Sequence, residues 1–284
     1  MSSKIFKKYN LVGDDLCYHH TVTYPKGECY YHGPEAHLQY EMLYLLGGAV
    51  SYIIEGETYD VKRGDMIFVA PNEIHTLKID GNEPYERIVL LFNMNILHGI
   101  MRELGVNLGA FSYDGKNRFH VIERCDVEKY ALDKMLLSII EEGGREEHKK
   151  LKIVSKLISL VVSIDKITAE SKNNFTPSMA SDRLVRAVTE YVDRNIDRQI
   201  RLDELAEELY VSKSTLCHRF SSLMNMTVNR YIITKKIYRA TELMGEGYSA
   251  QAAAEAVGYS NYTSFFYNYR KIMGVSPTAT ARGE

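Results

Sequence analysis

The sequence lacks the features that mark secreted, membrane-spanning and disulfide-bonded proteins. Its four cysteines, in 284 residues, include no CxxC pair, which argues against a zinc ribbon and against a disulfide framework. No stretch approaches the roughly 20 consecutive apolar residues that cross a bilayer. The first ten residues mix lysines with polar side chains and contain no apolar core of a secretory signal. A cytoplasmic protein without a membrane partner is therefore expected.

Catalytic motifs are missing as well. The segment 109–117, GAFSYDGKN, resembles a phosphate-binding loop, but it has five intervening residues in place of four and Asn117 where serine or threonine is needed. The motifs GxSxG and HExxH do not occur. The sequence predicts neither an enzyme nor a bound cofactor, apart from one alternative considered below.

Charge is unevenly distributed along the chain. The net charge is −2, but the residues from Tyr210 onward contain nine lysines and arginines against four acidic residues. A chain of this length accommodates two domains. The last quarter is therefore the part expected to lie against nucleic acid.

The first part of the chain reads as a β-structure. From about Tyr18 to Met94, polar and apolar residues alternate with period two between turn signals such as Gly47-Gly48 and Pro71-Asn72. This pattern predicts a small barrel or sandwich. The clearest expected strands cover Met42–Leu46, Ala49–Ile54, Asp65–Ala70 and Arg87–Phe92.

The periodicity then becomes helical, which makes the expected fold class α+β. Apolar residues at helical spacing predict helices over 127–142 and 151–167. A polar stretch over 169–178 reads as a linker. The expected organisation is a cupin-like effector-sensing barrel (1–95), a helical segment for dimerisation and coupling (96–168), the linker, and an all-α domain (179–284).

The last domain contains a repeat of about 48 residues. The segment LAEELYVS at 205–212 matches AAEAVGYS at 253–260, and one extra residue then enters the second copy. Each copy reads as a helix, a short turn and a second helix, with Ser212 and Ser260 as the expected caps. Two helix-turn-helix units are therefore predicted, about 10 base pairs apart on the duplex if both lie on one face of it.

The second helix of each unit is expected to present its polar face to the major groove of double-stranded DNA. Leu216, Phe220, Phe265 and Tyr269 are expected in the core. A connecting helix over 228–244 adds basic residues that would contact phosphates. The expected DNA-binding residues are Lys213, Ser214, Thr215, Cys217, His218, Arg219, Lys235, Lys236, Asn261, Tyr262, Thr263, Phe266, Tyr267 and Arg270.

These segments resemble the AraC/XylS family of bacterial regulators over about 100 residues from Asp182. The resemblance is carried by LAEELYVSKSTLCHRF, YIITKKIYRATELM, AAEAVGYSNYTSFFYNYRK and MGVSP. It implies a homodimer that binds an operator, works with RNA polymerase and responds to a small effector, most often a carbohydrate. The chain departs from the family at His218, Tyr267 and Lys236, so its operator sequence does not follow from the resemblance.

The segments HGPEAHLQYEMLYLLGG and GETYDVKRGDMIFVAPNEIH resemble the cupin barrel that often precedes this DNA-binding domain. Where metal-binding cupins have three histidines and a glutamate, this chain has Glu35, His37, Glu41 and His75. The favoured interpretation is a metal-free site that hydrogen-bonds a small polar effector. Two alternatives remain, a divalent ion in a metal-dependent cupin enzyme and a filled barrel that senses nothing. The expected effector-binding residues are Tyr30, His37, Glu41, Tyr44 and His75.

Overall fold

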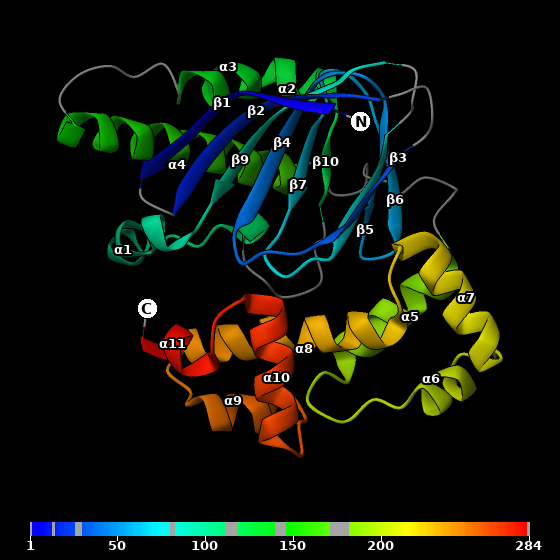
Figure 1. Ribbon diagram of the computed structural model, residues 1–284. Coiled ribbons are helices and arrows are strands. Elements are labelled where there is room, and N and C mark those ends of the chain that lie inside the picture. The colour runs from blue at the N-terminus through cyan, green and yellow to red at the C-terminus, as the bar shows by residue number, and fades with distance from the viewer. Residues whose placement is uncertain are drawn as a thin grey trace.

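The computed structural model describes residues 2–12, 15–25, 30–79, 83–111, 119–139, 146–170 and 182–282. Two antiparallel β-sheets and several helices form the N-terminal part, and the C-terminal part is entirely helical (Figure 1). This confirms the expected α+β fold class.

The two sheets contain ten strands within the described residues. The six-stranded sheet has the order β1 (Ser2–Val12), β2 (Leu16–Tyr24), β9 (Tyr85–Phe92), β4 (Tyr40–Gly47), β7 (Met66–Val69) and β10 (Val121–Ile122). The four-stranded sheet has the order β3 (Tyr30–Glu35), β8 (His75–Ile79), β5 (Val50–Ile54) and β6 (Glu57–Val61). The four strands expected from the alternation correspond to β4, β5, β7 and β9.

The alternation along β4 separates two cores. Tyr40, Met42 and Tyr44 belong to the apolar cluster that the sheet shares with the helices behind it. Leu43 and Leu45 belong to the cluster between the two sheets. Successive side chains of a strand point to opposite faces, so Glu41 points toward the second sheet.

Helices α1 (Asn95–Leu104), α2 (Arg124–Lys129), α3 (Leu132–Ser138) and α4 (Glu146–Glu170) accompany the six-stranded sheet (Figure 1). The single helix expected over 127–142 is wrong, because Ala131 adopts a left-handed conformation with φ 53° between α2 and α3. Helix α4 covers the second expected helix and continues to Glu170. The linker expected over 169–178 falls almost wholly outside the described residues.

The C-terminal part consists of seven helices within residues 182–282. They are α5 (Arg183–Arg194), α6 (Leu202–Glu208), α7 (Lys213–Met224), α8 (Val228–Gly245), α9 (Ala250–Ala256), α10 (Tyr262–Met273) and α11 (Pro277–Arg282). One apolar cluster surrounds Leu216 and Phe220, and another surrounds Phe265 and Tyr269. Helix α8 contributes to both clusters, so it connects two separately packed units.

Lys236 of α8 joins these two units. Its ammonium group is buried and donates hydrogen bonds to the carbonyl oxygens of Ile196 (2.9 Å) and Arg198 (2.7 Å), before α6, and to that of Val257, at the end of α9. Burial lowers the pKa of Lys236 to about 8. The amine is therefore still largely protonated at neutral pH, with three N–H donors for three carbonyl acceptors.

We expect Lys236→Met to destabilise the helical domain by about 2–4 kcal/mol, because three carbonyl groups lose their donor. Urea unfolding followed by circular dichroism measures the change. Lys271→Met is the control, since Lys271 is exposed on α10 and its loss should leave stability within about 0.5 kcal/mol. Equal stability of the two variants would contradict this role of Lys236.

Candidate DNA-reading helices and effector site

The two helix-turn-helix units have matching backbones. Helices α6 and α7 form the first unit, and helices α9 and α10 form the second. The repeat aligns Tyr210 with Gly258, and both adopt a left-handed conformation in the turn, with φ 54° and φ 73°. A side chain at Gly258 would also lie only 2.5 Å from the backbone of Arg198. The second unit thus needs glycine, whereas the exposed turn of the first accommodates tyrosine.

The caps of the second helices follow the one-residue insertion. Ser212 caps α7 by accepting a hydrogen bond from the amide of Thr215, as expected. The expectation for Ser260 is wrong, because Asn261 caps α10 and accepts from the amides of Thr263 and Ser264. The extra residue moves the cap one position along, and Asn261 then aligns with Ser212.

A polar stripe is exposed on each second helix. Equivalent positions after the insertion pair Ser214 with Thr263, Thr215 with Ser264, and His218 with Tyr267, and all six residues are exposed. We call these six residues the reading stripes. Arg270 extends the stripe of α10 and is also exposed. Short, hydrogen-bonding side chains on an exposed helix face can reach base edges in a major groove.

Some expected DNA-binding residues have partners within the protein. Arg219 binds the carboxylate of Asp182, the cap of α5, through Nε at 3.0 Å and Nη2 at 2.7 Å. Lys213 pairs with Asp203 at 3.0 Å. Cys217, Tyr262 and Phe266 are half-buried. The two ion pairs orient α7. The half-buried side chains pack partly against the protein and leave the rest of their surface accessible.

Lys235 and Lys236 do not lie where the sequence suggested. Both are only 5% exposed, so the expectation that they face phosphates is wrong for this arrangement of the chain. Helix α8 is packed between other elements on several sides. Among the described residues in the first turn of α8, the exposed cation is Arg230. Arg230 therefore replaces the two lysines as the candidate for a phosphate contact.

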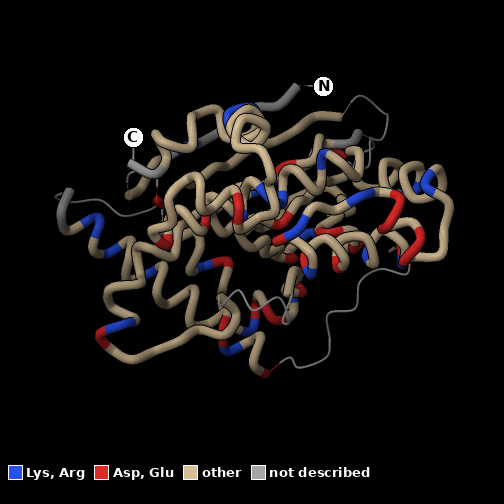
Figure 2. The backbone as a smooth tube through the Cα atoms, turned by 90° about the horizontal axis from the view of Figure 1, so that it is seen from below, with Lys and Arg blue, Asp and Glu red and all other residues tan. Residues whose placement is uncertain are grey.

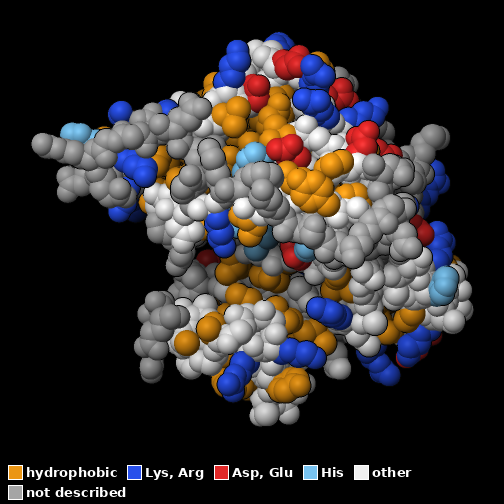
Figure 3. Space-filling view, turned by 45° about the horizontal axis from the view of Figure 1, so that its top comes forward, with side chains coloured by type: hydrophobic (Ala, Val, Ile, Leu, Met, Phe, Trp, Pro, Cys, Tyr) orange, Lys and Arg blue, Asp and Glu red, His pale blue; other side chains and the backbone are white. Residues whose placement is uncertain are grey.

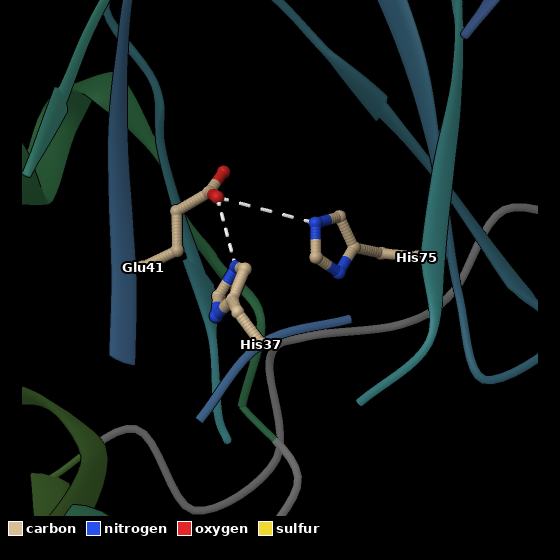
Figure 4. A group of neighbouring side chains, drawn as sticks. All are labelled: His37, Glu41 and His75. Atoms are coloured by element: carbon tan, nitrogen blue, oxygen red, sulfur yellow. Dashed lines mark hydrogen bonds and ion pairs between the residues drawn. The ribbon is translucent and has the colours of Figure 1, made fainter. Parts of the chain in front are cut away.

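His37, Glu41 and His75 come together between the two sheets (Figure 4). Glu41 is on β4, His75 begins β8, and His37 precedes β4. The Glu41 carboxylate lies 3.1 Å from Nε2 of His37 and 3.9 Å from Nε2 of His75. Glu41 and His75 are buried, and His37 is partly exposed.

The electrostatics of this trio favour a charged pair. Burial alone lowers the pKa of His37, but the hydrogen bond and negative charge of Glu41 outweigh it, so the pKa of His37 is raised. Burial alone raises the pKa of Glu41, but the hydrogen bond from His37 and the charge of His75 outweigh it, so the pKa of Glu41 is lowered.

Two further candidates, Tyr44 for the effector and Glu35 for a metal, lie outside the trio. Tyr44 packs against the cluster behind the sheet, on the face opposite Glu41, so its assignment to the effector site is wrong. Glu41 and Tyr44 are three residues apart on one strand, so their side chains point to opposite faces of the sheet. Glu35 lies 3.4 Å from His32 and is outside the trio. The side chain of Tyr30 lies outside the described part of the chain.

Sequence reasoning missed polar residues that share the inner face with Glu41. Thr21 and Thr23 of β2 are buried, and Arg87 of β9 donates a hydrogen bond to Thr23 at 3.0 Å. The hydroxyl groups of Tyr52 and Tyr85 lie 3.1 Å apart. The sequence did contain a signal for the residues of β2. Leu16 and Tyr18 pack on the opposite face, so the polar residues at odd-numbered positions of this strand point to the inner face.

A second missed feature is the contact between the two parts of the chain. Glu55, in the turn between β5 and β6, is 2% exposed and accepts a hydrogen bond from Nζ of Lys235 at 3.0 Å and another from the hydroxyl of Tyr231. Lys235 also pairs with Asp193 at 3.1 Å. We call Tyr231, Lys235, Tyr238 and Glu242 the docking face of α8, because all four contact the N-terminal part of the chain, which we call the β-domain.

The docking face meets the segments next to the two histidines of the trio. Tyr238 donates to the carbonyl of Ala36, next to His37, and Glu242 accepts from Asn72. The amide of Asn72 in turn donates to the carbonyl of His37 at 2.9 Å. On the other side, Glu55 accepts from the amide of Ile74 at 2.8 Å, and Ile74 precedes His75. Two successive hydrogen bonds, through Asn72, therefore connect Glu242 of α8 with the backbone of His37.

Two family models match the chain in this order. Residues 21–147 match an AraC-like ligand binding domain, and residues 205–283 match a helix-turn-helix domain. The chain belongs to the AraC/XylS family of transcriptional regulators. It is a DNA-binding regulator with an N-terminal ligand-binding domain and not an enzyme, which removes the alternative of a metal-dependent cupin enzyme.

Named relatives include the xylose operon regulatory protein of Haemophilus influenzae, 24% identical over 203 residues, which are 62% of this chain and 52% of that protein. The chain thus matches about half the length of that relative. The Msm operon regulatory protein of Streptococcus mutans is 22% identical over 96% of this chain and 95% of its own. Among solved structures, ToxT from Vibrio cholerae covers 95% of this chain and 98% of its own at 15% identity, with a TM-score of 0.39.

Bulk charge does not mark the DNA-binding face of this regulator. Seen from the side of the C-terminal helices, Lys and Arg positions are interspersed with Asp and Glu (Figure 2). On the face drawn in Figure 3, basic side chains are likewise scattered and do not form one patch. Among the described helices, none has the length and apolar character of a membrane span. Neither view shows a single basic surface over the described residues.

We expect His218→Ala and Tyr267→Ala each to relax base preference in the operator. Losing a side chain that reads a base costs about 1–3 kcal/mol of discrimination, which is about 5-fold to 150-fold. The operator is first selected from a random duplex pool, and affinity is then measured for single-base variants. Arg230→Ala is the comparison, since Arg230 is the candidate phosphate contact and its loss should flatten the salt dependence by about one unit while base preference is kept. Unchanged preference in both stripe variants would exclude the stripes as the reading surface.

Proposed function

We propose that this regulator binds a carbohydrate between its two sheets and that the ligand controls operator binding through the docking face of α8. One observation carries the proposal. The segments that hold His37 and His75 in the effector site are also the segments that α8 contacts. A ligand that displaces these loops changes the surface on which α8 docks.

The coupling follows from linkage. If the sugar favours one arrangement of the two domains and the operator favours one arrangement, each ligand changes the affinity for the other by the same factor. Glu55 is central to this coupling because it touches the amide of Ile74 on one side and Lys235 on the other. Docked α8 fixes where both reading stripes lie relative to the β-domain.

A carbohydrate suits the chemistry of the inner face. Glu41, Thr21, Arg87 and the histidines offer donors and acceptors, which sugar hydroxyl groups match. One relative is named as a xylose operon regulator, which supports a sugar as the ligand class. The test is a thermal-shift screen of pentoses and hexoses with the full chain, followed by operator binding with any sugar that stabilises it. A panel without a stabilising sugar would refute the carbohydrate ligand.

We expect Glu55→Gln to uncouple sugar from DNA. Removing one partner of a buried ion pair costs about 3–5 kcal/mol, which exceeds the 1–3 kcal/mol of a typical coupling. The sugar should then change operator affinity less than twofold, although it still binds. Glu57→Gln is the matched control, because the one ion pair of Glu57 across the same contact, with Arg186 at 3.6 Å, is partly exposed and worth less than about 1 kcal/mol. Its other hydrogen bond, from the hydroxyl of Tyr59 at 2.8 Å, stays within β6. A full sugar response in Glu55→Gln would show that the docking face carries no signal.

The outer face of α4 supports the homodimer. Leu151 is 72% exposed and Val162 is 49% exposed. With Ser155 and the half-buried Ile158, they follow one another at helical spacing on one face. A second copy would cover this stripe and bring two DNA-binding domains to one repeated operator, where RNA polymerase would be the further partner.

We expect Val162→Glu to shift the chain from dimer to monomer, because a carboxylate would enter an apolar interface. Light scattering after size exclusion gives the mass. Leu104→Glu is the control, since Leu104 on α1 is also an exposed apolar residue, at 69% against 49% for Val162. The same mass for both variants, whether monomer or dimer, would place the interface elsewhere.

A further inference from the structure

Arg87 is a second polar position on the face that carries Glu41, apart from the trio. Its strand β9 lies between β2 and β4 (Figure 1). Ile88 and Leu90 belong to the cluster behind the sheet, so the odd-numbered residues of β9 point toward the second sheet. Glu41 is paired with Leu91, which is four residues beyond Arg87. The Cα atoms of Glu41 and Arg87 are therefore about 13 Å apart along the strands.

The guanidinium group of Arg87 is held in position, but its charge is not paired. Nη1 donates a hydrogen bond to the hydroxyl of Thr23 at 3.0 Å, and Cζ lies 4.4 Å from the centre of the Tyr85 ring. Neither contact, within the part of the chain that the structure describes, is to a carboxylate. A guanidinium group has five N–H donors, and a partly buried charge is stabilised by an opposite one. A negative group is the missing partner.

The six-stranded sheet has little negative charge to offer at this position. Its described strands contain two carboxylates, those of Glu41 and Glu86. Glu86 lies on the opposite face, where it is 2.8 Å from Nε2 of His20. Glu41 is 3.1 Å from Nε2 of His37, which balances its charge. Arg87 therefore leaves an excess positive charge on the inner face of this sheet.

His19 responds to the same excess of positive charge. It lies on the inner face of β2, two residues before Thr21, which is paired with Arg87. Burial lowers the pKa of His19, and the charges of Lys8 and Arg87 lower it further, although the charge of Glu41 opposes them. A position that disfavours a second positive charge favours a negative one. Two independent observations, the unpaired guanidinium and the neighbouring imidazole, thus indicate an anion.

We propose that the effector carries an anionic group, a carboxylate or a phosphate, that binds Arg87. This inference rests on the proposed function, because the ligand is the one held between the two sheets. A planar guanidinium group can donate two parallel hydrogen bonds to either group, and such charged pairs are stronger than neutral hydrogen bonds. The carboxylate of Glu41 repels the same group from the trio. The ligand is therefore an acidic sugar, with its acid group at Arg87 and its hydroxyl groups at the trio.

The wild-type protein tests this without any substitution. The full chain, without DNA, is titrated in a calorimeter with xylose, glucose and galactose, with the corresponding sugar acids xylonate, glucuronate and galacturonate, and with the three sugar phosphates. Butyrate and inorganic phosphate are the acids without a sugar. We expect at least one acidic sugar to bind at least tenfold more tightly than its neutral parent and to lose affinity as salt is added. The carboxylate and phosphate series show which anion is bound.

The outcomes separate the anionic group from the carbohydrate. Equal affinities within every series, or no binding of any acidic probe, would overturn the anionic group, and neutral sugars that still bind would keep the carbohydrate ligand. Butyrate or inorganic phosphate that binds as tightly as every acidic sugar would support the anionic group and refute the carbohydrate ligand.

Substitutions then assign the anion to Arg87. Arg87→Gln removes the charge and keeps a donor for Thr23, and Arg87→Lys keeps the charge without the planar group. Arg63→Met is the matched control, because Arg63 is exposed in the turn between β6 and β7 and its loss removes the same charge from the same domain. Circular dichroism verifies that each variant is folded.

We expect Arg87→Gln to bind the acidic sugar at least tenfold more weakly, with the affinity for the neutral parent unchanged. Arg87→Lys should be intermediate, because a point charge replaces the two parallel hydrogen bonds, and Arg63→Met should bind like the wild type. Unchanged affinity for the acidic sugar in both Arg87 variants would overturn the proposal. An equal loss for acidic and neutral sugars would also overturn it, since Arg87 would then only support the fold of the site.

Discussion

Two adjacent ammonium groups buried on α8 determine how the rest of the molecule is arranged. Lys235 reaches Glu55 and Asp193, and Lys236 reaches two backbone carbonyls before α6 and one at the end of α9. A buried charge is tolerated only where partners surround it. Neighbouring positions on a helix point about 100° apart. The rotation of α8 about its axis is therefore fixed, with one lysine toward the β-domain and the other toward the segment before α6 and the end of α9.

The effector site is shaped by the same rule about buried polar groups. Glu41 shares its face of β4 with Leu43 and Leu45, and it is accommodated because His37 and His75 approach it. Those histidines are in turn held by carbonyls of Gln39 and Glu73. The loops that provide these carbonyls also form the surface for α8. A change in what occupies the trio thus alters the backbone on which the helical domain rests.

Local rules explain which features were predictable. The strands followed from period-two alternation, and the helix-turn-helix repeat followed from matched core positions, because both depend on neighbours in sequence. The alternation of side chains between the two faces of β4 could also have excluded Tyr44 from the effector site. Ser260 failed as a cap because the insertion was placed after it. The burial of Lys235 and Lys236 and the role of Glu55 depend on partners more than 20 residues away, and a polar residue in a turn or on a helix gives no local sign of them.

The placement of the two lysines separates a rigid part of the molecule from an adjustable one. Lys236 binds backbone groups that belong to the packed helical domain itself, so the distance between the reading stripes is fixed as long as that domain is folded. Lys235 binds a side chain of the other domain. The contact around it consists of a few polar groups and of Ile53 and Ile74, which pack into the apolar cluster of α5 and α7. Such a contact can open without unfolding either domain. Regulation in this protein should therefore act on where the pair of reading helices lies relative to the β-domain, and not on the spacing within the pair.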